Sequence, residues 1–191
     1  MSKRTIVVMP GDGIGKAVLD ETLRVIEAAG FDADYVEGDI GWEFWKKEGN
    51  PLPQRTIDLI AEHKIALFGA ITSKPKDEAF EELAPELKDK GLVYSSPIVG
   101  LRQHFNLEIC ARPCKTYKGN PLNFIRRGAG DSIEEPMVDV VVFRQNTEGL
   151  YAGSGGFLKK GTPDEIAVQE SINTRKGVER CLRYAYEYTK K

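Results

Sequence analysis

The sequence predicts an α/β fold in which a parallel or mixed sheet is flanked by helices. Short apolar stretches typical of strands alternate along the chain with longer amphipathic stretches typical of helices, and this alternation favours parallel strands joined by helices. The composition agrees with a globular fold, because 41% of the 191 residues are hydrophobic and 29% are charged. A chain of this length and composition can bury a core.

Strand and helix patterns follow one another through the first half of the chain. The expected strands cover residues 5–9, 33–37 and 65–68. The expected helices cover residues 14–29, 55–62 with a start near Pro53, and 78–88. Gly30 should end the first helix, since glycine readily adopts the conformation found after a helix C-terminus. Pro85 should interrupt the third helix, because proline has no N–H to donate.

The second half begins with a helix for which Ser96 is the expected N-cap and Pro97 the first residue. The strands expected after it cover residues 107–112, 138–143 and 165–172. Cys110 and Arg112 share one face of the first of these strands, and Pro113 should end its pairing. Two polar, glycine-containing stretches are expected to be loops, at residues 116–136 and 154–163. Thr174 should cap a final amphipathic helix.

Charge and cysteine content exclude several classes of protein. The 27 basic and 29 acidic residues give a net charge of −2, so no strong field points to nucleic acid or to an anionic membrane. No apolar run is long enough to span a bilayer, and the basic start leads into a strand and not into a signal peptide. The three cysteines form no C-x-x-C pair, which is typical of free thiols in the cytoplasm.

The segment from Arg144 to Tyr151 carries the strongest functional signal. A buried strand runs directly into Arg144, and ligands gather beyond the C-terminal ends of strands in open α/β sheets. The planar guanidinium group matches two carboxylate or phosphate oxygens at once, and a tyrosine can donate a proton. The alternative is that Arg144 caps the strand end and Tyr151 packs under a loop.

A glycine-rich turn from Gly11 to Gly15 follows the first strand and opens the first helix. In a Rossmann fold such glycines approach a pyrophosphate, and Glu37 would hold the ribose. Lys16 stands where the last glycine of that motif belongs. The other interpretation is a tight strand-to-helix turn, with Ile14 touching a cofactor.

Four motifs in order resemble the β-decarboxylating dehydrogenases, the isocitrate and isopropylmalate dehydrogenase family. They lie at residues 6–15, 101–113, 144–153 and 171–177. The third reads RQNTEGLYAG and is similar to the family's R-E-N-[ST]-E-[DG]-x-Y-x-G. The match runs from residue 5 to the end of the chain. Since the family's chains extend well beyond this length, the chain resembles a truncated enzyme, its N-terminal half.

The resemblance implies an isopropylmalate-dehydrogenase-like fold and not a Rossmann fold. Residues 1–112 would then form a first α/β domain, the N-terminal part of the large domain. Residues 113–191 would begin a second domain for substrate binding and dimerisation. A homodimer is expected because such enzymes share active sites between subunits. Trp42, Phe44 and Trp45 would serve packing or such an interface.

The resemblance also implies roles for individual residues. The substrate-binding residues would be Ser96, Arg102, Arg112 and Arg144, with the serine against the γ-carboxylate and the arginines on the carboxylates of a 2-hydroxy acid. Tyr151 would reprotonate the enolate left by decarboxylation. The residues in contact with NAD or NADP would be Ile14, Thr72 and Ser73. A Mg²⁺ or Mn²⁺ ion is also implied, and its ligands are expected outside this chain.

Isocitrate is the substrate that the resemblance favours, with hydride transfer to NAD or NADP. Gln145 and Ile98 depart from the pattern of isocitrate enzymes, which have a glutamate and often an asparagine at these positions. The string from Ser96 to Val99 looks more like homoisocitrate dehydrogenases, and 3-isopropylmalate dehydrogenase is a third alternative. A non-catalytic regulatory subunit of such an enzyme also stays open.

Overall fold

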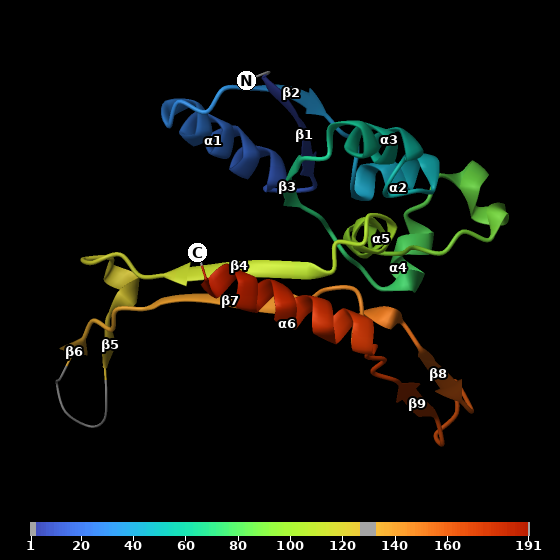
Figure 1. Ribbon diagram of the computed structural model, residues 1–191. Helices are drawn as coiled ribbons and strands as arrows, with labels where there is room; N and C mark the ends of the chain where they lie inside the picture. Colours follow the sequence, from blue (N-terminus) through green and yellow to red (C-terminus); the bar gives the residue numbers. More distant parts are fainter. Residues whose placement is uncertain (1–2, 127–132, 191) are drawn as a thin grey trace. The chain divides into compact units, whose positions relative to one another are not determined.

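The computed structural model describes residues 3–126 and 133–190 (Figure 1). The chain divides into two compact units, Met1–Leu101 and Arg102–Lys191. Part of the expected loop at residues 116–136, namely residues 127–132, lies outside the described residues. In the described ranges, no helix is long and apolar enough to cross a membrane.

The first unit is built on a parallel sheet in the order β2-β1-β3. Its strands are β1 (Arg4–Gly11), β2 (Ala33–Glu37) and β3 (Ala66–Ala70), and the helices beside it are α1 (Gly15–Ala28) and α3 (Gln54–His63). The central strand contains a run of buried residues, Ile6, Val7, Val8 and Met9. A parallel strand covered on both faces reads as a continuous apolar run, and Figure 1 shows α1 and α3 on opposite sides of β1.

A second apolar cluster in this unit lies among α2 (Trp42–Glu48), α4 (Lys76–Glu81) and the 3-10 helix η1 (Pro85–Lys90). Its buried members are Trp42, Trp45, Ala79, Leu83, Leu87 and Tyr94. The ring of Tyr94 meets both indoles edge-on, with centroids 4.9 and 5.4 Å apart. The two tryptophans therefore serve packing and not an interface. The helix expected over residues 78–88 is divided into α4 and η1, and Pro85 begins the second piece.

The second unit is built on an antiparallel pair, β4 (Ile109–Lys115) and β7 (Asp139–Gln145). The final helix α6 (Arg175–Thr189) covers one face of this pair, where Phe143 contacts the rings of Tyr184 and Tyr188. The helix α5 (Pro97–His104) spans the division between the units, and two short 3-10 helices follow, η2 (Pro121–Asn123) and η3 (Leu150–Ala152). Two further antiparallel pairs are β5 (Ile125–Arg126) with β6 (Ile133–Glu134) and β8 (Gly155–Leu158) with β9 (Ile166–Gln169). Since β4 pairs with β7 along its whole length, the units divide before β4, whereas the sequence prediction put a boundary after residue 112.

Two expectations about local structure were wrong. Pro113 does not end its strand, because the pairing continues to Lys115. The carbonyl of Glu108 and the amide of Thr116 both bond towards β7. Backbone groups alternate in direction along a strand, so the nitrogen of Pro113 points away from β7 and no ladder bond is lost.

The stretch at 154–163 is not simply a loop, because it contains β8. A Cβ on Gly155 would lie 2.2 Å from the carbonyl oxygen of Val168. This glycine therefore permits close cross-strand approach.

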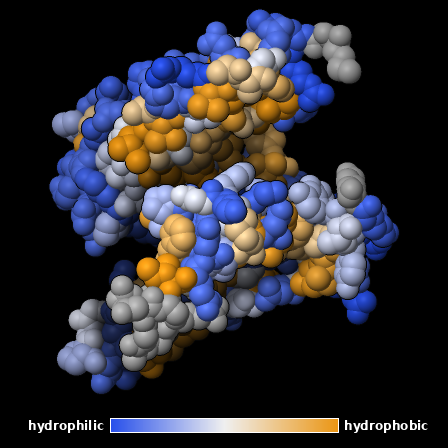
Figure 2. Space-filling view, turned by 90° about the vertical axis from the view of Figure 1, so that its left-hand side faces the viewer, coloured by the Kyte–Doolittle hydropathy of each residue, from blue (hydrophilic) through white to orange (hydrophobic). Residues whose placement is uncertain are grey.

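Apolar side chains reach the surface of the described chain in several places. On the face drawn in Figure 2 they form orange areas among polar side chains. In the β8–β9 hairpin, Phe157, Leu158, Ile166 and Val168 are all about half exposed. A two-stranded hairpin is marginally stable by itself, and these side chains leave it with an apolar surface.

Candidate active site

The β4–β7 register places two of the predicted arginines on one face of the strand pair. Cys110 lies opposite Arg144, and Arg112 lies opposite Val142. Side chains alternate between the faces of a strand, so these residues occupy the face opposite to Phe143, which contacts α6. We call the surface formed by Cys110, Arg112, Arg144 and Val142 the arginine face.

Arg102 and Tyr151 join the arginine face from neighbouring segments. The guanidinium carbons of Arg102 and Arg144 lie 5.6 and 5.5 Å from the centre of the Tyr151 ring, which is within cation–π range. The amide of Gln103 donates to the Tyr151 carbonyl at 3.4 Å. The structure thus brings together Arg102, Arg112, Arg144 and Tyr151. Tyr151 itself is 36% exposed.

Asn146 holds Arg144 in place. It is 7% exposed, and its amide oxygen accepts from Nη2 of Arg144 at 2.7 Å. Its own backbone N–H donates to the Glu108 carbonyl at 2.8 Å, and its Nδ2 donates to the Leu107 carbonyl at 3.4 Å. Nε of Arg144 is buried and has no hydrogen-bond partner among the described residues. A buried, unpaired guanidinium donor is suited to an anionic ligand.

Gln145 closes the turn that leads to Tyr151. Its side-chain oxygen accepts from the backbone N–H groups of Thr147 and Glu148 at 2.9 and 2.7 Å. Its Nε2 donates to the Thr147 hydroxyl at 2.8 Å. A glutamate would offer the same acceptor to these two N–H groups, so the departure at residue 145 keeps the turn intact.

Glu148 connects this turn to the start of α6. Its carboxylate accepts from the Thr174 backbone N–H at 2.8 Å and from the Thr174 hydroxyl at 2.5 Å. These bonds lower the pKa of Glu148, the side-chain bond most. The Thr174 hydroxyl also accepts from the N–H of Gly177 at 3.0 Å, which confirms the predicted N-cap. A Cβ on Gly177 would lie 2.5 Å from the Glu148 carboxylate.

In the first unit, the glycine-rich turn brings backbone segments close together. A Cβ on Gly11 would lie 1.9 Å from the Ala70 carbonyl oxygen, and one on Gly15 would lie 2.1 Å from the Pro10 carbonyl oxygen. The space that a dinucleotide motif leaves open is therefore filled by the chain itself, which supports the interpretation as a tight turn. Ile14 follows the turn and is 73% exposed, so a ligand can reach it.

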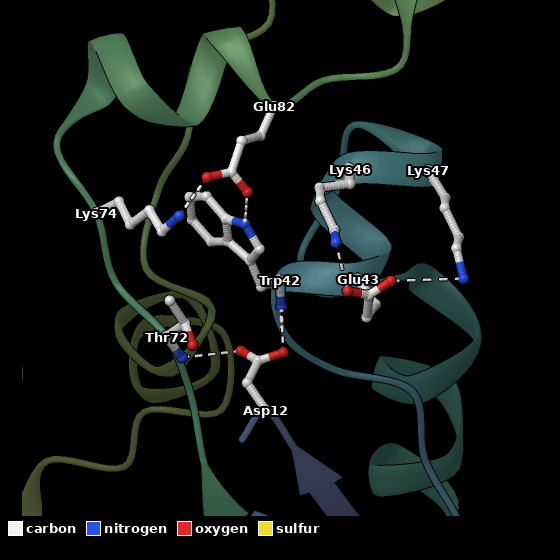
Figure 3. Close-up of polar contacts among 8 residues, drawn as sticks. All are labelled: Asp12, Trp42, Glu43, Lys46, Lys47, Thr72, Lys74 and Glu82. Carbon is white, nitrogen blue, oxygen red and sulfur yellow. Dashed lines mark hydrogen bonds and ion pairs between the residues drawn. The ribbon is translucent and has the colours of Figure 1, made fainter.

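Asp12 fixes the segment that carries the other predicted cofactor contacts (Figure 3). Its two carboxylate oxygens accept from the backbone N–H groups of Trp42 and Thr72, at 2.7 and 2.8 Å. The hydroxyl of Tyr94 donates to the Thr72 carbonyl at 3.0 Å, and burial raises the pKa of Tyr94. Thr72 is thus held on both sides, while Ser73 is exposed.

Glu82 orders the neighbourhood of Trp42. Its carboxylate accepts from the indole N–H at 2.6 Å and pairs with Lys74.

Ser96 directly precedes α5, and its carbonyl accepts from the Gly100 N–H at 3.0 Å, as at an N-cap. Within the described ranges, no group of three or more His, Cys, Asp and Glu residues could hold a metal ion.

The sequence analysis missed Asp12, Asn146 and Glu148 as positioning residues. Asp12 and Glu148 have partners 30, 60 and 26 residues away along the chain. Asn146 bonds Arg144 two residues away, but it is anchored by Leu107, 39 residues away. Local patterns do not reveal such distant contacts. A groove of about 550 Å³ in the second unit is lined by residues of the α6 side, including Leu107 and Tyr184. It mixes arginines with glutamates and so offers a carboxylate ligand less net attraction than the arginine face.

Comparisons with known proteins agree with these motifs. The family model of the isocitrate/isopropylmalate dehydrogenases matches residues 5–191. Protein DlpA of Legionella pneumophila is 43% identical over 200 residues, covering 96% of this chain and 30% of the relative. The 3-isopropylmalate dehydrogenase of Thermobifida fusca is 38% identical, over 97% of this chain and 49% of that enzyme. The homoisocitrate dehydrogenase of Methanocaldococcus jannaschii is 37% identical, over 96% of this chain and 47% of that enzyme.

A solved structure gives the same result for the fold. Isocitrate dehydrogenase from Methylococcus capsulatus matches with a TM-score of 0.74 and 32% identity, covering 98% of this chain and 48% of that one. The chain spans about half the length of the dehydrogenases that it matches. The chain therefore belongs to the isocitrate/isopropylmalate dehydrogenase family of NAD(P)-dependent β-decarboxylating enzymes, and it corresponds to about the N-terminal half of its relatives.

Proposed function

We propose that this chain forms the substrate-holding part of an enzyme that oxidatively decarboxylates a 2-hydroxy polycarboxylic acid. Isocitrate is the first candidate substrate, and homoisocitrate and 3-isopropylmalate are the alternatives. The observation that carries the proposal is the placement of Arg102 and Arg144 at 5.6 and 5.5 Å from the Tyr151 ring, with Arg112 on the same strand face as Arg144. Several carboxylates need several fixed positive groups.

The arginines have distinct parts in this proposal. Arg144 is fixed through Asn146 and still has its Nε unpaired, so it presents a donor to a carboxylate. Arg112 is exposed and can turn towards a second carboxylate. Arg102 lies in the last turn of α5, whose start carries Ser96. Arg102 is proposed to meet one carboxylate of the acid, and Ser96 a further oxygen.

Tyr151 is the proposed proton donor. Its ring is kept in position by the two guanidinium groups and its main chain by Gln103, while the side chain remains partly exposed. A tyrosine hydroxyl at such a place can reprotonate the carbon from which carbon dioxide leaves. The neighbouring positive charges favour the negative charge that develops on the substrate.

The cofactor contacts are proposed for the first unit. Ile14 and Ser73 are exposed and Thr72 is held by Asp12 and Tyr94, which fits residues that contact a ligand from a fixed backbone. NAD or NADP supplies the hydride acceptor when it is bound, and Mg²⁺ or Mn²⁺, with ligands outside this chain, supplies positive charge at the substrate hydroxyl. We further propose a cytoplasmic homodimer.

Turnover by the complete enzyme tests this function. Isocitrate, homoisocitrate and 3-isopropylmalate should be supplied in turn with NAD or NADP and Mg²⁺, and one of them should be oxidised and decarboxylated. Arg112→Ala should then raise KM strongly, because losing a charged hydrogen bond in a closed site costs about 2–5 kcal/mol, and each ~1.4 kcal/mol is about tenfold in affinity.

Two results would count against this assignment. Binding of an acid without turnover would favour a non-catalytic regulatory subunit, the remaining alternative. Unchanged kinetics in Arg112→Ala would show that Arg112 is structural. Arg183→Ala on the exposed side of α6 is the matched control, and its kinetics should be unaltered.

A further inference from the structure

The thiol of Cys110 lies within the arginine face. Cys110 is half-buried, stands opposite Arg144 in the strand pair, and accepts from Nε of Arg112 at 3.4 Å. Cys110 therefore places a nucleophilic group beside the two guanidinium groups of the arginine face. No step of the proposed reaction uses this thiol.

The positive charges favour the thiolate form of Cys110. The hydrogen bond from Arg112 lowers the pKa of the thiol most, burial acts against it, and the charges of Arg144, Arg112 and Arg102 lower it further. Cysteine beside basic side chains is more reactive because the thiolate is the nucleophile. Independently of the thiol, Nε of Arg144 is buried and has no hydrogen-bond partner among the described residues, which leaves one donor of this face for an anion.

The chain contains two other cysteines, which provide internal controls. Cys114 lies on the same face of β4 but stands opposite Val140, and its Sγ donates to the carbonyl of Arg112 at 3.8 Å. Cys181 lies on α6. Both are free thiols. Cys114 also lies near the charge of Arg112, so Cys110 differs from it by the hydrogen bond from Arg112 and by its position opposite Arg144.

We propose that Cys110 is a site of reversible mixed-disulfide formation with small disulfides that carry carboxylates. The arginines that hold the carboxylates of the substrate in the proposed function would also hold those of the reagent, and the attached group would then obstruct the arginine face. The modification is thus a redox control of the proposed substrate site.

The exchange balances without a further reactant. The Cys110 thiol gives its proton to water, and the thiolate attacks one sulfur of the small disulfide. A new S–S bond forms to Cys110 while the old one breaks, and the other half leaves as a thiolate with the electron pair. Cys110 is oxidised and the leaving half is reduced, so an added thiol reverses the reaction.

Two single-cysteine variants test the proposal with the chain itself. One retains Cys110 and carries Cys114→Ser and Cys181→Ser, and the other retains Cys114 and carries Cys110→Ser and Cys181→Ser. Each reacts with dithiobis(nitrobenzoate), which is anionic, and with dithiodipyridine, which is neutral. The rate with the anionic reagent divided by the rate with the neutral reagent measures how strongly the site prefers a negative charge. This ratio does not depend on the fraction of the cysteine that is thiolate, because that fraction affects both rates equally. At low salt this ratio should be at least about tenfold higher for Cys110, and it should fall as salt screens the charges.

Substitutions of Arg112 extend the test and guard against misfolding. Arg112→Gln in the Cys110 variant should lower the rate ratio several-fold, while Arg112→Lys should retain most of it. Unfolding in urea should abolish the difference between Cys110 and Cys114. Equal ratios for the two folded variants, or a ratio that Arg112→Gln leaves unchanged, would overturn the proposal.

Isocitrate, a tricarboxylate, separates this proposal from the proposed function. Slower modification of Cys110 in its presence supports both. In the complete enzyme with Mg²⁺, an anionic preference at Cys110 without protection by isocitrate, homoisocitrate or 3-isopropylmalate supports the disulfide site and contradicts the substrate site. Turnover of one of these acids together with equal rate ratios for the two cysteines supports the enzyme and overturns the disulfide site.

Discussion

At the scale of single residues, the candidate site depends on side chains that touch no predicted ligand. Asn146 accepts from one end of the Arg144 guanidinium and leaves Nε free. Gln145 uses its side-chain oxygen to collect two N–H groups of the turn before Tyr151. Local hydrogen bonds from such side chains to the backbone stabilise turns. The chemistry proposed for Arg144 and Tyr151 therefore depends on two amides between them.

Tyr151→Phe tests the proposed proton donor in the complete enzyme. The substitution keeps the ring, and with it the contacts to Arg102 and Arg144, so substrate binding should change little. Removing a general acid lowers the rate by about 10²–10⁴, and kcat should fall by such a factor while KM stays nearly constant.

Partial reactions identify the step that Tyr151→Phe affects. The keto-acid intermediate can be supplied directly, and its reduction by the reduced cofactor should survive better than its decarboxylation and reprotonation. Tyr117→Phe, at an exposed tyrosine of the second unit, is the control and should retain full turnover. Full turnover in Tyr151→Phe would show that its hydroxyl has no part in the reaction.

At the scale of elements, the sequence predicted the strands of the parallel sheet and the helices α1 and α3, missed α2 and β8, and predicted strand partners poorly. The apolar run of β1, the N-cap Thr174 and the break at Pro85 are local signals, and the structure confirms each. Whether Pro113 fits a strand depends on the side to which its nitrogen points, which only the pairing with β7 determines.

The same limit applies to the candidate site. Alternation along β4 was enough to place Cys110 and Arg112 on one face, but the approach of Tyr151 to Arg102 across 49 positions of the chain was implied only by the family resemblance. Contacts of this separation depend on tertiary packing and not on local pattern.

Glu148 couples the turn before Tyr151 to the start of α6, so Glu148→Gln should destabilise the chain at neutral pH. The pKa of Glu148 is lowered in the folded state, chiefly by the Thr174 hydroxyl. The ionised carboxylate thus contributes stability above its unfolded pKa, and that contribution is lost as pH falls through the folded pKa. As the pH is lowered from about 6 to about 3, the free energy of unfolding measured in urea should fall less for Glu148→Gln than for the native chain.

The control for this prediction is a glutamate of α6 with a weaker contact. Glu179 meets only Arg175 in a surface pair at 3.6 Å, and such pairs contribute little. Glu179→Gln should therefore keep the native pH profile of unfolding. A profile of Glu148→Gln that coincides with the native one would show that the contact between Glu148 and Thr174 does not contribute to stability.

At the scale of the whole molecule, the two units differ in how well they cover their apolar side chains. The first unit has a buried central strand and a buried aromatic cluster. In the second unit, apolar residues of β7, of the β8–β9 hairpin and of α6 remain exposed, among them Val142, Phe157 and Leu182. Large exposed apolar surface marks a site of association, and it lies in the unit for which a dimerisation domain was predicted.

The β8–β9 hairpin therefore replaces Trp42 and Trp45 as the reason to expect a homodimer. Phe157 is 55% exposed on this hairpin, and Phe157→Asp would put a charge where a second subunit should cover the ring. Light scattering of the complete protein at micromolar concentration should show a dimer, and Phe157→Asp should shift it towards monomer. Phe31→Asp, at a residue 51% exposed in the first unit, should leave the dimer intact. Native protein that is monomeric at this concentration rules out the dimer. A dimer that withstands Phe157→Asp means instead that another part of the same chain covers the hairpin.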